Sequence, residues 1–402
     1  MSSEAAKGIV RVEPGTTPAA ELAFQPRALI LWWCRGAVAG CAGGIGFATD
    51  GGGEASTAWA ADDALAPGVL SRWGAEAPLL FHKDPRAPEA SSRGHIRFAE
   101  RGFSVEYDRE PADPWLVHYL ALGGSDVHAA VRNLVLDGTG TYSVSGLGFT
   151  PGCVLATIGA GLTVREPQSD LAVGFGAAAG RSRQAAGGFV ARADAGQTIA
   201  RGAQCTDALA VLPVAAPSAG IAAHSRLVSF DRDGFTLETT RLTSELPLAV
   251  LVLEGGDYSV GLGTASSRAT AVGFEPAGAL LFGTGLTATA HARDIGRFCL
   301  GGFSRDQSAG CISWSVRARG AWPLDPRSRS TTEAAFEVTD TTSAELHARA
   351  VLSSLGRRRF SLSWPVRDRY PRDFGFVAFG PKVPKPALRD RLRVRRGGAL
   401  RE

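Results

Sequence analysis

Lysine is nearly missing from this chain of 402 residues, because four lysines stand against 39 arginines. No single function demands such a bias across a whole chain, so it indicates G- and C-rich codon usage. The net charge of +4 is unevenly distributed: residues 381–402 hold eight Lys or Arg and two Asp or Glu, a net of +6, which leaves −2 for the rest. A nearly neutral body has no general field for holding nucleic acid, so nucleic acid is not expected as its partner.

Motifs for metal binding, phosphate binding and nucleophilic catalysis are also missing. The six cysteines include no C-x-x-C pair and no Cys/His cluster with zinc spacing. They keep no register between the repeats described below, which favours buried free thiols over disulfides. There is no G-x-S-x-G and no phosphate-binding loop. The seven histidines are dispersed, and His118 lies inside an apolar run, where a core or edge residue is expected rather than a base. We therefore expect no enzyme activity, no metal and no cofactor.

Long apolar segments are scarce. The N-terminus "MSSEAAKGIV" has no apolar core of signal-peptide length, so no secretory leader is expected. Residues 28–48 resemble a membrane span, with Arg35 as the only charge. The matching positions in the other repeats carry charges between two short apolar runs, which predicts a strand, a loop and a second strand.

What the sequence does contain is a threefold internal repeat. Phe24, Phe149 and Phe274 each precede a proline by two residues and are 125 residues apart. An apolar run, a Gly-Phe pair and an aromatic residue follow in every copy. The Gly-Phe pairs are Gly46-Phe47, Gly174-Phe175 and Gly302-Phe303, and the aromatics are Trp59, Phe189 and Trp314.

The closing half of each copy is also repeated. "ERGFSVEYDREPADPWLVHYLALGG" matches "RDGFTLETTRLTSELPLAVLVLEGG" and "RRRFSLSWPVRDRYPRDFGFVAFG", with 21 residues between equivalent ends. A copy of 125 residues exceeds the 20–50 residues of solenoid repeats, so each should be a complete domain. The expected divisions are residues 1–126, 127–257 and 258–380, followed by a basic and flexible tail over 381–402.

The composition predicts the class of these domains. Fifty glycines, 22 prolines and many Val, Leu, Thr and Ser indicate short strands joined by turns. "FSVEY" alternates like a half-buried strand, whereas "LAVLVLE" is continuously apolar like a central one. Asp137-Gly138 predicts a β-hairpin within "NLVLDGTGTYSVSG". We predict an all-β chain of three tandem β-sandwiches, jelly-roll-like, with seven or eight strands each. Three such domains make a pseudo-threefold arrangement possible.

The segments Phe24 to Trp33 and Gly102 to Val127, with their counterparts, resemble repeats in structural proteins of tailed bacteriophages and phage-like particles. This resemblance covers about residues 8–380, and the third copy departs from it because "VAFG" lacks the second glycine and the Ser-Asp turn. It implies a non-enzymatic structural or adhesion component, such as a virion decoration, tail or fibre protein. It also implies assembly in the host cytoplasm, location in the particle, and other particle proteins as partners in a homo- or hetero-oligomer.

Two alternatives remain open. A carbohydrate-binding adhesin would use Trp59, Trp115 or Trp314 as ligand contacts on a cell-surface glycan, although buried core is the competing interpretation for all three. A glycan hydrolase would use Glu106 and Asp108, which share one face of a predicted strand.

Two further sets of charged residues have candidate roles. Asp50 with Glu54, or Asp62 with Asp63, are candidate calcium ligands, although no spaced acidic loop is present. The tail is a candidate docking arm through Arg389, Arg391, Arg393, Arg395 and Arg396, and a solvated end is the alternative.

Overall fold

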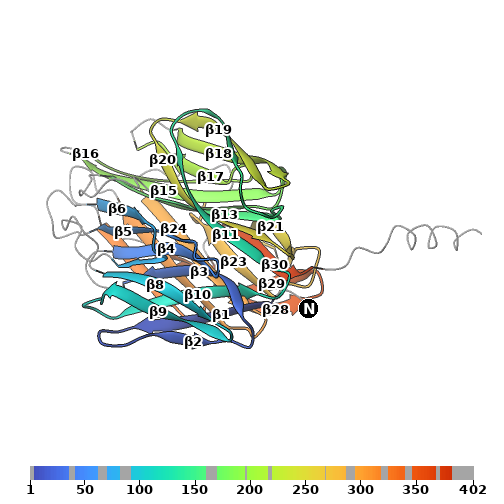
Figure 1. Ribbon diagram of the computed structural model, residues 1–402. Coiled ribbons are helices and arrows are strands. Elements are labelled where there is room, and N and C mark those ends of the chain that lie inside the picture. The colour runs from blue at the N-terminus through green and yellow to red at the C-terminus, as the bar shows by residue number, and fades with distance from the viewer. Residues whose placement is uncertain are drawn as a thin grey trace, which may run out of the picture.

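The protein is all-β, as the composition predicted, with every element in the described parts of the chain a β-strand (Figure 1). The computed structural model describes residues 4–35, 41–61, 70–81, 92–159, 170–194, 197–215, 220–267, 269–286, 295–317, 325–339, 346–367 and 372–382. No described helix is long and apolar enough to cross a membrane. The tail arginines from Arg389 to Arg396 lie outside these ranges, as do Asp62 and Asp63.

The first ten strands form two antiparallel sheets. A six-stranded sheet has the order β1-β10-β3-β4-β5-β6, and a four-stranded sheet has the order β2-β9-β8-β7. The strands are β1 Glu4–Val12, β2 Ala19–Glu21, β3 Pro26–Cys34, β4 Cys41–Thr49, β5 Glu54–Ala61, β6 Leu70–Ala75, β7 Leu79–Phe81, β8 Ser92–Ala99, β9 Gly102–Arg109 and β10 Trp115–Gly123. Residues 28–48 thus contribute two strands, β3 and β4, as predicted.

The second ten strands repeat this topology, with the orders β11-β20-β13-β14-β15-β16 and β12-β19-β18-β17. They are β11 His128–Leu136, β12 Gly140–Val144, β13 Cys153–Ile158, β14 Asp170–Ala178, β15 Gln184–Asp194, β16 Gln197–Cys205, β17 Ala210–Pro213, β18 Ile221–Asp231, β19 Gly234–Leu242 and β20 Leu246–Glu254.

The last ten strands do so again, with the orders β21-β30-β23-β24-β25-β26 and β22-β29-β28-β27. They are β21 Gly256–Thr264, β22 Thr270–Ala271, β23 Gly278–Gly283, β24 Ile295–Ser304, β25 Ala309–Arg317, β26 Asp325–Thr331, β27 Phe336–Thr339, β28 Leu346–Gly356, β29 Arg359–Val366 and β30 Asp373–Pro381.

Each repeat therefore has ten strands rather than the seven or eight that the sequence predicted. The additional strands include β2, β7 and β22, which have three, three and two residues and are too short to show an alternating pattern. The strand order also departs from an eight-stranded jelly roll. The first strand pairs with the last and the second with the ninth, but β3 to β6 follow one another as consecutive hairpins in a single sheet.

The predicted hairpin at Asp137-Gly138 was wrong. The two strands that flank it belong to different sheets, because β11 pairs with β20 and β12 pairs with β19. The turn is a corner between sheets, held by the Tyr142 hydroxyl, which accepts hydrogen bonds from the backbone N–H of Asp137 (3.1 Å) and of Gly138 (2.8 Å). A turn-forming dipeptide marks a change of direction but does not specify the strands that pair.

The central strands of the six-stranded sheets are buried on both faces, which explains their continuous apolar runs. In β3, Ile30 and Trp32 belong to one core cluster, whereas Leu31 and Trp33 belong to another. The second cluster lies within the first sandwich, between its two sheets, and the other repeats have corresponding clusters. The first cluster joins all three repeats.

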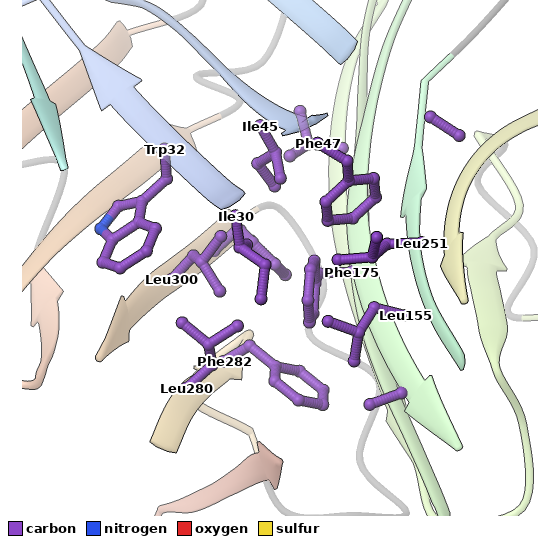
Figure 2. Close-up of a cluster of buried hydrophobic side chains, with 14 of the residues drawn as sticks. Ile30, Trp32, Ile45, Phe47, Leu155, Phe175, Leu251, Leu280, Phe282 and Leu300 are labelled. Carbon is purple, nitrogen blue, oxygen red and sulfur yellow. The ribbon is translucent and has the colours of Figure 1, made fainter. Parts of the chain in front are cut away.

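This shared core closes the three repeats into a ring. It combines Ile30 and Trp32 of the first repeat with Leu155 and Phe175 of the second and with Leu280, Phe282 and Leu300 of the third (Figure 2). β6 contacts β14, β16 contacts β24, and β26 contacts β4. The same two positions meet at each junction, so the arrangement is a cyclic, pseudo-threefold one within a single chain.

The strand registers also correct one sequence landmark. Leu31, Ala156 and Leu281, spaced by 125 residues, pair with Gly46, Gly176 and Gly301, so Gly46 is equivalent to Gly176 and Gly301 rather than to Gly174 and Gly302. A Cβ at Gly46 would lie 1.8 Å from the Pro78 carbonyl oxygen, and one at Gly176 would lie 1.9 Å from that of Leu209. Glycine is needed at these positions because the backbone of Pro78 or Leu209 passes directly against the six-stranded sheet, hereafter the inner sheet of each repeat.

Candidate functional site

The junctions between repeats contain the most distinctive chemistry in the described structure. The first and second repeats are joined by Thr57 and Thr157, whose hydroxyl oxygens are 2.7 Å apart. The second and third are joined by the side-chain oxygen of Gln204, which accepts the backbone N–H of Thr284 at 3.1 Å. The Arg183 guanidinium also donates to the Tyr258 carbonyl oxygen at 3.0 Å across the same junction. The junction of the third repeat with the first is a more extensive polar cluster.

Lys7, on edge strand β1, anchors that cluster. Its ammonium group donates to the Ala309 carbonyl oxygen at 2.6 Å, and its backbone N–H donates to the Ser304 hydroxyl at 2.8 Å. The Ser308 hydroxyl in turn donates to the Lys7 carbonyl oxygen at 2.8 Å. Burial lowers the pKa of Lys7 to about 8, and the nearby Asp306 carboxylate opposes this shift only in part. Strand β1 is thereby fixed to the β24–β25 hairpin.

His118 lies deeper in the same junction. Its Nε2 is 2.8 Å from the Ser330 hydroxyl oxygen, and its ring stacks on Trp32 with a centroid separation of 5.7 Å. Burial, reinforced by the charge of Lys7, lowers the pKa of His118 to about 3. Since the ring is neutral at physiological pH and enclosed, it is a core residue, as the sequence analysis expected. The participation of Ser330, 212 residues away, could not be read from the sequence.

The structure places two of the three candidate tryptophans in the shared core. Trp59 and Trp314 are each 1% exposed, and their rings meet edge to face with centroids 4.5 Å apart. They occupy equivalent register positions, together with Phe189, in the second hairpin strand of each inner sheet. Neither indole is presented to solvent, so the buried-core alternative describes both. A direct contact with a glycan would require the three repeats to separate.

Trp115 is also buried, at 4% exposed, but it borders a hollow on the surface. This groove between the first and third repeats has a volume of about 520 Å³. Its charged lining comes from both repeats, with Arg11 and Glu13 from the first and Arg329, which also pairs with Glu337, from the third. Trp115 therefore lies beside a space that a small molecule could enter.

The two carboxylates considered for catalysis lie on β9 but point into separate contacts. Glu106 accepts a hydrogen bond from Arg97 at 2.6 Å. Asp108 is 3.2 Å from Nε2 of His95, whose Nδ1 is 2.7 Å from the Glu54 carboxylate. The pKa of His95 is raised, because these two carboxylates outweigh the burial that alone would lower it. Glu106 and Asp108 are thus ion-paired side chains of a surface cluster.

The same contacts account for the first pair of calcium candidates. Glu54 accepts the backbone N–H of Ile96 at 2.8 Å in addition to contacting His95. Asp50 forms an ion pair with Arg27. The two carboxylates therefore point to different partners rather than to one cation.

The structure also brings together a group that the sequence analysis missed. Cys205, Asp207 and His224 each offer a ligand atom, and these three atoms lie within 4.8 Å of one another. Cys205 and Asp207 are two residues apart, but His224 follows 17 residues later on another sheet, so no standard zinc spacing announces the group. Burial raises the pKa of the Cys205 thiol to about 12, helped by the Asp207 carboxylate and opposed by backbone N–H groups.

No disulfide joins any of the six cysteines, as predicted, and five of the six are buried. Comparison of the chain with protein-family models and with curated proteins finds no match.

Proposed function

We propose that the chain is a non-enzymatic structural component of a phage or phage-like particle, assembled with other particle proteins. The observation that supports this proposal is the closed pseudo-threefold ring. Each repeat buries its six-stranded sheet against the other two, and the shared core contains large rigid side chains from all three repeats. Such a body resists bending between its domains and presents three similar outer sheets around one axis.

The surface is consistent with polar assembly contacts. Among the residues whose side chains the structure describes, Val135 is the one large apolar residue that is substantially exposed, at 46%. A particle component of this kind would therefore associate through charged and hydrogen-bonding groups, whose contribution falls as ionic strength rises. The five tail arginines named above supply a candidate docking arm of this character.

Sedimentation of a lysate of the native source tests the proposal. Fractions from a density gradient are analysed by quantitative peptide mass spectrometry. We expect co-migration with particles at a fixed copy number, and release from them at high salt. Absence of the chain from all particle fractions would reject a structural role. A chain in which the five tail arginines are replaced by alanine, expressed in the same source, separates docking by the tail from docking by the folded body.

A carbohydrate-binding adhesin is the second candidate, and the groove beside Trp115 favours it. Charged side chains next to an aromatic wall, in a hollow of about 520 Å³, suit a small polar ligand. We expect a glycan array to give saturable binding that is weakened by Glu13→Gln or Arg329→Gln. A matched change outside the groove, Arg232→Gln on an exposed turn, should leave binding unchanged.

A further inference from the structure

One outer corner of the second repeat gathers a cysteine, a carboxylate and a histidine. Cys205 is the last residue of β16, the edge strand of the six-stranded sheet, and Asp207 follows in the connection to β17. His224 lies on β18 of the opposite, four-stranded sheet. The three ligand atoms are within 4.8 Å of one another although they come from both layers of the sandwich.

Thr240 holds the histidine ring through a hydrogen bond to Nδ1. Its hydroxyl oxygen is 2.9 Å from Nδ1 of His224, and its hydroxyl donates to the His224 carbonyl oxygen at 3.4 Å. With the ring proton on Nδ1, the Thr240 oxygen accepts the hydrogen bond from Nδ1–H, and Nε2 carries a lone pair. Orientation of a metal-binding histidine through its other ring nitrogen is common in metal sites.

That lone pair faces the Asp207 carboxylate, with Nε2 and Oδ1 3.3 Å apart. Two acceptors at this distance repel each other unless a proton or a cation lies between them. Ligands about 2.0–2.2 Å from a tetrahedral zinc ion are roughly 3.4 Å from each other, which matches the observed spacing. The side chain of Asp207 is 71% exposed and that of His224 is 19% exposed, so an ion could enter from solvent.

The third repeat shows what this corner looks like without the three ligands. Strand registers place Thr331 at the position of Cys205, and Arg349 at the position of His224. Arg349 forms an ion pair with Glu333, N to O 2.6 Å, where the second repeat has Asp207. The third repeat thus fills this corner with the Arg349 guanidinium. The second repeat has the shorter His224 imidazole at that position and the Cys205 thiol at the position of Thr331.

We propose that Cys205, Asp207 and His224 bind a divalent transition-metal ion, with Zn²⁺ as the expected species. Sulfur, imidazole nitrogen and carboxylate oxygen together are a ligand set that zinc accepts. Three protein ligands leave a fourth position for water. Binding replaces the proton of the Cys205 thiol, which passes to the solvent, and the ion connects the edge strand β16 with β18 across the two sheets.

Metal titration of the full-length, untagged protein tests this site. We expect one Zn²⁺ per chain by metal analysis after dialysis, and Co²⁺ used as a probe should give the intense sulfur-to-cobalt absorption of thiolate ligation. Cys205→Ser should abolish that absorption. Thr240→Val should weaken Zn²⁺ binding about 10–100-fold by releasing the ring, and Thr240→Ser should restore it.

The matched control is Cys205→Thr with His224→Arg, which places the residues of the third repeat at these two positions and leaves Asp207 to pair with the guanidinium as Glu333 pairs with Arg349. It should retain the circular dichroism of the parent and lose the bound Zn²⁺. Exposed His128→Gln in the same repeat should change nothing. If the parent gives no thiolate–cobalt absorption, or the double variant binds Zn²⁺ as tightly as the parent, the corner holds an imidazolium–carboxylate pair and the proposal is wrong.

Discussion

Acidification should weaken the junction between the third and first repeats through a single buried ring, that of His118. Its pKa is lowered to about 3 by burial and by the neighbouring Lys7, against an ordinary value of about 6.5. Between these two values the unfolded chain binds a proton that the folded chain does not. The free energy of unfolding must therefore fall as the pH decreases from about 6.5 toward 3.

The size of this effect follows from the shift. Each pH unit within the window is worth about 1.4 kcal/mol, so His118 alone should remove about 3 kcal/mol between pH 6.5 and pH 4. For a typical stability of about 5–15 kcal/mol, this is a large fraction. His118→Gln supplies the reference, because an amide cannot titrate in this range and can still hydrogen-bond to the Ser330 hydroxyl.

The assay is urea unfolding of both proteins at pH 7 and pH 4, followed by tryptophan fluorescence and by circular dichroism. Coincident transitions by the two probes are required before free energies are compared. Carboxylates titrate in both proteins, so their contributions cancel in the difference between parent and variant. We expect the parent to lose about 3 kcal/mol relative to the variant on acidification. A difference that stays constant to within about 0.5 kcal/mol would refute the reasoning, since it would mean that the ring is hydrated and charges freely in the folded protein.

Three further perturbations probe the ring of repeats. Trp314→Ala should lower the free energy of unfolding, measured in urea, by about 3–5 kcal/mol, as expected for a fully buried indole. The double variant with Trp59→Ala should show a coupling energy of about 1 kcal/mol from the edge-to-face contact of the two rings, and strictly additive losses would argue against that contact. Gly176→Ala should destabilise the protein by about 2 kcal/mol or more, because its Cβ would lie 1.9 Å from the Leu209 carbonyl oxygen. An unchanged melting temperature would mean that the two backbone segments are not in such close contact. Lys7→Met should flatten the pH dependence of stability above pH 8. Because the pKa of Lys7 is about 8 in the folded protein and about 10.5 in the unfolded chain, only the unfolded chain holds this proton between these values. The free energy of unfolding of the parent should therefore rise by up to about 3 kcal/mol across that window, and that of the variant should not.

The repeat and the strand class could be predicted from the sequence, because both are recorded locally. The 125-residue spacing of Phe24, Phe149 and Phe274 is a property of one-dimensional order. Alternation in "FSVEY" and short apolar runs such as "RALILWW" report the two-residue period of a strand directly. The equivalence of Trp59, Phe189 and Trp314 was also visible, although their shared location was not.

Pairing and side-chain surroundings were decided by the tertiary structure. Asp137-Gly138 looked like a hairpin, but β12 pairs with β19, some 95 residues further along, because the hydrophobic faces of two layers had to meet. The apolar run of β3 fits any buried strand, and only the ring explains why Trp32 and Trp33 are buried on opposite faces.

The contacts of the polar side chains were likewise decided by the tertiary structure. Nothing in the sequence near His118 indicates Ser330, and nothing near Cys205 indicates His224, since these partners come from other strands or another repeat. The sequence by itself determined that this chain consists of strands in three similar copies, since hydrophobic period and repeat length are local quantities. The tertiary structure decided which faces close on one another and which distant polar atoms meet there, because burial and electrostatics depend on separation in space.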